Sequence, residues 1–145
     1  MNASTTSSGV KQTPFIGDDE IETLYSMAHQ LHTGGMRAKA RELFALVAAY
    51  RPRSVRYGKA LGLSLMGNGE YEKAIPVLAA AILCNPESDP ALSVAFAECL
   101  ALTNRRQQAK RLFQKARIAL GTADGCTETM RLHQHAERWL AILGR

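Results

Sequence analysis

Two histidine pairs are the residues of this sequence best suited to metal chemistry. His29 and His32 lie three positions apart, so a helix would place both imidazoles on one face. A zinc site needs at least three protein ligands, and no cysteine or acidic partner is placed beside them. His133 and His135 are two positions apart and do not share a helical face. We therefore predict no metal site, and interpret His29 and His32 as polar residues that line a surface.

No other pattern typical of catalysis is present. We interpret Gly34-Gly35 and Gly67-x-Gly69 as turn glycines and not as phosphate loops, because no strand precedes them and no lysine–serine pair follows. HExxH and GxSxG motifs and paired cysteine ligands are absent. We predict a protein that is not an enzyme and that binds no cofactor. Three widely spaced cysteines, an odd number, favour a reducing cytoplasm over a disulfide framework: Cys84, Cys99 and Cys126.

A basic cluster in the C-terminal half is the remaining candidate for chemistry, because it could meet phosphate. Three of its members, Arg106, Lys110 and Arg117, form a stripe along one helix. No aromatic residues suited to base stacking accompany them, and the formal net charge of +5 is a mild excess. We interpret the cluster as a solvated outer face and predict no nucleic-acid partner. The full cluster is Arg105, Arg106, Lys110, Arg111, Lys115 and Arg117.

Composition predicts one helical domain. A chain of 145 residues is long enough for a continuous core, and hydrophobic residues make up 46% of it. Alanine and leucine dominate while aromatics are only 6%, which favours helices over strands. No run of 18 apolar residues occurs, so we expect no membrane insertion. The N-terminus lacks a basic patch followed by an apolar run, so we expect no secretory signal.

The N-terminal segment is polar and rich in serine and threonine. We predict that residues 1–18 form a disordered tail, because residues 1–13 offer almost nothing to bury. Asp19 followed by Glu22 resembles a capping box, which predicts a first helix that begins near Glu20. The folded domain is then residues 19–145.

Internal repetition decides the predicted fold. Residues 55–88 fit one helix–turn–helix unit of the 34-residue tetratricopeptide type. Its small packing residues, turn and closing proline are Leu61-Gly62, Gly69-Glu70-Tyr71, Ala74, Ala81 and Pro86. A shift of 34 positions back gives a matching unit at residues 21–54, through Ala28, Gly35, Ala40, Phe44 and Pro52.

The third unit is offset by one residue, because Ala109 lies 35 positions after Ala74. In this phase Asn104 replaces the turn glycine, which asparagine can do because it tolerates the left-handed conformation. Asp89 followed by Pro90 is a typical helix start, and Gly121 a typical stop. We therefore predict a unit at about 90–121.

One further helix is predicted at about 127–143. Its apolar residues recur at helical spacing, and an open stack of repeats needs a terminal cap to cover its last apolar face. We interpret Trp139 as a core residue of this capping helix. The prediction is an all-α solenoid of three helical hairpins plus a C-terminal capping helix.

In stacked hairpins the first helix of each unit lines the concave side, where peptides bind. The residues that we expect to line this groove are Tyr25, His29 and His32 in the first unit, Arg56, Lys59, Leu63 and Met66 in the second, and Val94, Glu98, Ala101 and Leu102 in the third.

Several segments together resemble a known family, the class II chaperones of bacterial type III secretion systems (LcrH/SycD-like proteins). The segments, which span about residues 20–120, are Leu24-Tyr25-x-x-Ala28, Gly35-x-x-x-x-Ala40-x-x-x-Phe44-x-Leu46, Arg56-Tyr57-x-x-x-Leu61-Gly62, Gly69-x-Tyr71-x-x-Ala74-Ile75 and Ala97-Glu98-Cys99-Leu100. The last of these is the most specific.

The resemblance implies a cytoplasmic chaperone that binds an extended segment of hydrophobic, pore-forming translocator proteins and keeps them soluble until export. It also implies a homodimer, with Phe15 and Ile16 as interface candidates, and in some members a role as co-activator of an AraC-type regulator. Two alternatives stay open: a general tetratricopeptide scaffold, and a co-chaperone of the secretion needle subunit.

Overall fold

The computed structural model describes residues 15–85, 87, 89–121 and 125–145, and this part of the chain contains helices and no strands. The prediction of an all-α fold is confirmed. The expected disorder of residues 1–14 and the closing role of Pro86 lie outside the described residues. The helices are α1 (Asp18–Thr33), α2 (Arg37–Tyr50), α3 (Val55–Gly67), α4 (Tyr71–Leu83), α5 (Pro90–Leu102), α6 (Arg106–Gly121) and α7 (Thr127–Leu143).

The first helix begins earlier than expected. Gly17 is its N-cap, and no side chain caps it. The predicted capping box at Asp19 is therefore wrong, since Asp19 already lies inside the helix and its carbonyl accepts a hydrogen bond from the Thr23 hydroxyl. The acidic residues of this first turn still favour the helix, because negative charge stabilises a helix N-terminus. By contrast, the Asp89 carboxylate does cap α5 by accepting the Ala91 N–H at 2.9 Å.

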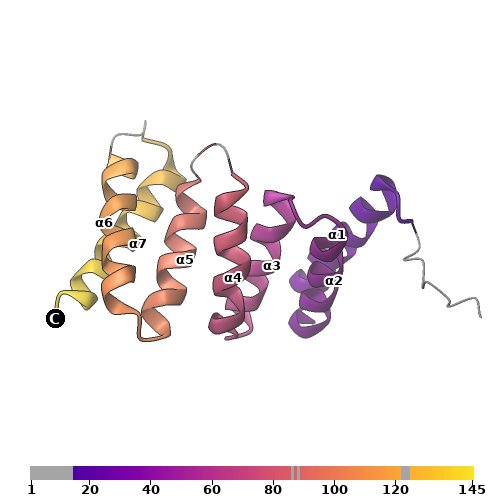
Figure 1. Cartoon of the computed structure of the whole chain (residues 1–145), viewed down its shortest axis with the longest axis horizontal. Helices are drawn as coiled ribbons and strands as arrows, with labels where there is room; N and C mark the ends of the chain where they lie inside the picture. Colours follow the sequence, from indigo (N-terminus) through magenta and orange to yellow (C-terminus); the bar gives the residue numbers. More distant parts are fainter. Residues whose placement is uncertain (1–14, 86, 88, 122–124) are drawn as a thin grey trace, which may run out of the picture.

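The helices stand side by side in chain order, so the molecule is elongated, with α1 and α2 at one end and α7 at the other (Figure 1). Consecutive helices pack on one another throughout. In addition α5 contacts both α3 and α7, whereas α4 contacts neither α2 nor α6. The helices α3, α5 and α7 are therefore closer to one another than the even-numbered helices are. We call the surface of α1, α3, α5 and α7 that faces away from the even-numbered helices the inner face.

Each hairpin turn uses the same backbone device. Gly35, Gly69 and Asn104 all have positive φ, at 82°, 75° and 65°. The residue after each of them donates its N–H to a carbonyl five positions back, at 2.8 to 2.9 Å, which closes the end of the preceding helix. These positions are 34 and 35 residues apart, so the one-residue offset of the third unit and the left-handed Asn104 are both confirmed.

Small residues allow the two helices of each hairpin to approach. Ala40, Ala74 and Ala109 are all fully buried at equivalent positions of the second helices. One turn later each second helix buries a large side chain, in order Phe44, Leu78 and Phe113. The core is thus a row of similar clusters, one for each hairpin.

The last helix covers the open end of the stack. Ala136 of α7 is fully buried against α5 and α6, and the Trp139 ring stacks on Phe113 with centroids 5.8 Å apart. Trp139 is therefore half-buried and packs against the core of the third hairpin, at the edge of the core in which it was predicted. No helix in the described ranges is long and apolar enough to cross a membrane.

Candidate peptide-binding groove

The residues expected from α3 form one stripe of the inner face. Arg56, Lys59, Leu63 and Met66 recur at intervals of three or four residues, which places them on one side of the helix. Arg56 reaches Glu22 of α1 in one direction, and Lys59 reaches the start of α5 in the other. The stripe therefore faces the neighbouring odd-numbered helices and not α4.

Leu63 provides the free apolar surface of this stripe, with 45% of the residue exposed. Leu102, near the end of α5, is similarly exposed at 43%. Met66 is half-buried, because it also packs against the core of the middle hairpin. Ala101 is half-buried too, against the cluster of the third hairpin.

Val94 does not line a groove, which corrects the sequence prediction. It is only 3% exposed and belongs to the cluster that joins the third hairpin to the capping helix. The reason is the position of α5, which packs against α4, α6, α7 and α3 and so has apolar residues nearly all round. A helix of this kind offers no polar side from which the groove-facing positions can be counted.

An aromatic cluster closes the α1 end of the inner face. The Tyr25 ring lies 4.5 Å from the His29 ring and 5.1 Å from the Tyr57 ring, between centroids. The His29 ring also packs on Phe44 at 5.0 Å. His29 is thus used in ring packing, while His32 is exposed near the end of α1. No group of three or more histidine, cysteine or acidic side chains is arranged for a metal ion in the described ranges.

Glu22 binds two residues at this end of the inner face, and it was not among the residues predicted for the groove. Its carboxylate accepts the Tyr57 hydroxyl at 2.5 Å and the Arg56 guanidinium at 2.6 Å. The Arg56 guanidinium also lies 4.4 Å above the Tyr25 ring, a cation–π contact. The Tyr57 hydrogen bond lowers the pKa of Glu22, and the Arg56 charge acts in the same direction. The same bond raises the pKa of Tyr57.

The other two junctions between odd-numbered helices carry polar side-chain pairs as well. Lys59 Nζ lies 2.8 Å from an Asp89 carboxylate oxygen. Burial on its own would raise the pKa of Asp89, but the bond and charge of Lys59 and the helix N–H groups outweigh it and lower the pKa. Glu98 lies 3.0 Å from His135 Nε2 of α7. His135 was not among the predicted residues, because its partner is 37 positions away in sequence.

These three pairs have a common consequence. Each charged residue expected in the groove has a partner on, or at the start of, a neighbouring odd-numbered helix, so the pairs link these helices along the inner face. What remains for direct contact with a ligand is mainly apolar surface, led by Leu63 and Leu102. Such a surface can seat alternate side chains of an extended peptide.

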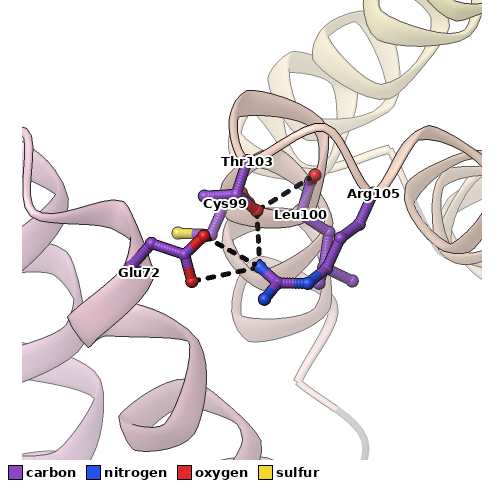
Figure 2. A network of polar contacts seen from close by, with 5 residues as sticks. All are labelled: Glu72, Cys99, Leu100, Thr103 and Arg105. Atoms are coloured by element: carbon purple, nitrogen blue, oxygen red, sulfur yellow. Dashed lines mark hydrogen bonds and ion pairs between the residues drawn. The ribbon is translucent and has the colours of Figure 1, made fainter.

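One member of the basic cluster also bridges two hairpins. Arg105 donates to the Glu72 carboxylate of α4 at 3.2 and 3.3 Å and to the Thr103 hydroxyl at 2.9 Å (Figure 2). Thr103 in turn donates to the Cys99 carbonyl at 2.8 Å. Burial raises the pKa of the Cys99 thiol to about 11, so this thiol stays protonated and packs as a small apolar group, as expected.

Comparison with known proteins supports this architecture. Residues 65–122 match the tetratricopeptide repeat family. No curated protein matches the sequence. The matched stretch covers α4, α5 and α6, and the described part of the chain is an all-α stack of helical hairpins of this type.

Three solved structures have the same fold. PcrH of Pseudomonas aeruginosa in complex with the chaperone binding region of PopD is 20% identical, with a TM-score of 0.78 over 92% of this chain and 97% of that one. SycD of Yersinia enterocolitica, a type III secretion chaperone, in complex with a peptide of the translocator YopD is 20% identical, with a TM-score of 0.77 over 88% and 95%. SycD in an alternative dimer is 20% identical, with a TM-score of 0.76 over 88% and 94%. The fold is that of the type III secretion translocator chaperones.

Proposed function

We propose that this protein is a non-enzymatic chaperone of the cytoplasm that binds an extended segment of a type III secretion translocator on its inner face. The observation that carries the proposal is the exposed apolar surface of Leu63 and Leu102 on the inner face of a solenoid whose fold PcrH and SycD share. Those two proteins are known in complex with the chaperone binding region of PopD and with a peptide of YopD.

The physical role follows from the properties of the client. A protein that will insert into a membrane exposes large apolar patches before export, and such patches cause aggregation in water. Occupying one apolar segment in a groove removes that surface from water and keeps the client soluble. Because polar side-chain pairs already link the odd-numbered helices, we expect little ordering of the chaperone on binding, which favours affinity.

Co-expression tests the proposal directly. The chain is produced together with each translocator of its host's secretion system, and the soluble fraction of the translocator is measured with and without it. We expect the translocator to be soluble and to co-purify only when the chain is present. Co-purification of the needle subunit instead would favour the needle co-chaperone, and binding to neither would leave only the scaffold alternative.

A homodimer is the second part of the proposal. Phe15 is 97% exposed, which is unfavourable for a large apolar side chain unless a partner covers it. The carbonyl of the adjacent Ile16 accepts a hydrogen bond from Arg51 at 3.3 Å, so the pair is held at the surface of the first hairpin. Light scattering of Phe15→Ser against the parent chain checks this, and a parent that is monomeric at high micromolar concentration would contradict it.

A further inference from the structure

The net charge of the chain resides on one helix. Five of the 18 lysines and arginines lie on α6, which has no acidic residue, and the remaining 13 are matched by the 13 aspartates and glutamates elsewhere. Within the described ranges, none of these five cations makes an ion pair, whereas Arg41, Arg51, Arg56, Lys59, Lys73 and Arg105 all do. Their charge is thus available to a partner.

A cavity adjoins this helix on the side opposite the inner face. It has a volume of about 370 Å³ and opens between α4 and α6, which do not touch each other, with α5 as its floor. Its apolar lining includes Ile82, Leu92, Phe96 and Leu112. Two carboxylates, Glu87 and Asp89, line its end near the α4–α5 connection, and Asp89 is already paired with Lys59. Lys115 lies on its α6 rim, and Arg111, one turn earlier on the same side of the helix, continues that rim.

An equivalent gap between α2 and α4 differs from this cavity in the charge of its lining residues. It has a similar size, about 400 Å³, and its floor is α3, but small apolar residues line it and no charged residue does. Of these two gaps, the α6 cavity is therefore the one that combines apolar lining with free positive charge along its α6 edge.

We propose that this cavity and its basic rim are a docking surface for an acidic amphipathic segment of a partner protein. An apolar side chain of the segment enters the cavity, and its carboxylates meet Arg111 and Lys115. Charge complementarity of this kind selects the partner and speeds its association. An apolar interior has no use in binding phosphate, so the observations favour a protein segment over a nucleic acid. The α6 edge of this surface uses none of the residues predicted for the groove, and the proposal goes beyond the chaperone role.

The experiment uses two labelled synthetic helical peptides, one with leucines on one face and glutamates on the other, and one with the leucines replaced by serines. Fluorescence anisotropy measures their binding to the full chain. We expect the leucine peptide to bind, and the serine peptide to bind at least about tenfold more weakly, because only the former fills the cavity. Failure of the leucine peptide to bind, or equal binding of the two, overturns the proposal.

Charge and cavity are then tested one at a time. Arg111→Glu with Lys115→Glu should weaken the leucine peptide at least about tenfold, while Arg37→Glu with Lys39→Glu, the same charge change at exposed sites on α2, should have less than about a twofold effect. Ser93→Phe, which fills the cavity from α5, should also prevent binding, whereas Ala80→Phe in the uncharged gap should not. The proposal is wrong if the α6 and α2 charge variants lose peptide affinity equally, or if Ser93→Phe and Ala80→Phe do.

Two further measurements distinguish this surface from the groove, and a protein partner from a nucleic acid. Leu63→Glu should leave peptide binding intact even where it abolishes translocator binding, so failure of the chaperone role does not decide this proposal. The second measurement uses a duplex DNA probe. If the DNA binds more tightly than the leucine peptide, and if Arg111→Glu with Lys115→Glu abolishes its binding, the surface binds nucleic acid and the proposal of a protein partner is wrong.

Discussion

The side chain of Leu78 occupies the space that a side chain at residue 62 would need: a Cβ added to Gly62 would lie 2.4 Å from Leu78 Cδ2. Leu78 is fully buried at the centre of the middle hairpin, so it cannot move aside freely. The contact sets how closely α3 and α4 pack, and with them the stripe that carries Leu63.

Gly62→Ala is therefore expected to destabilise the protein. Overpacking a core costs about 1–3 kcal/mol, which exceeds the gain of roughly 1 kcal/mol in helix propensity. Urea denaturation followed by circular dichroism gives the difference. Gly67→Ala on the same helix is the control, because nothing lies within 4 Å of its added Cβ, and it should be neutral or stabilising. Equal stability of the two variants would mean that the hairpin tolerates a wider spacing.

Leu63→Glu should weaken translocator binding by roughly one to two orders of magnitude, because burying such a side chain against a ligand contributes about 1.5–3 kcal/mol. The residue is exposed in the free chain, so the melting temperature should stay close to the parent's. Ala74→Glu is the contrasting variant, since it places a charge in a fully buried contact and should unfold the hairpin. Normal binding by Leu63→Glu, measured by calorimetry, would place the groove elsewhere.

Removing residues 127–145 should cause aggregation or a clear loss of stability. The truncation exposes Phe113 and Leu120, which α7 now helps to cover. Trp139→Ala is the milder test, with an expected loss of about 2–4 kcal/mol, because the ring is only half-buried. Thermal melts and light scattering measure both. A truncated chain that stays soluble with an unchanged melting temperature would refute the capping role.

The bridge between Lys59 and Asp89 should make stability depend on acidity. Because the folded-state pKa of Asp89 is lowered, its stabilising effect is complete above the unfolded pKa near 4 and is lost as pH falls through the lower folded value. Asp89→Asn keeps the helix cap and removes the charge. The melting temperature of this variant should therefore fall less than the parent's between pH 7 and pH 3. Parallel curves for the two proteins would show that the bridge does not contribute.

The hairpins could be predicted from the sequence because their determinants are local and repeat. Gly35, Gly69 and Asn104 recur at near-constant spacing, and each supplies a left-handed residue that few others tolerate. The small residue that follows five positions later marks where two helices meet. Such signals depend on backbone conformation and side-chain volume, and neither requires knowledge of the neighbouring hairpin.

Which residues are exposed on the inner face, and which of them pair between hairpins, could be learned only from the tertiary structure. Val94 is buried because α5 has neighbours nearly all round, and an evenly apolar helix has no periodic pattern from which its exposed side can be read. Glu22 with Tyr57, and Glu98 with His135, meet across 35 and 37 positions. Which polar side chains meet at that sequence separation depends on the stagger between successive hairpins, and that stagger is set by the packing of whole helices.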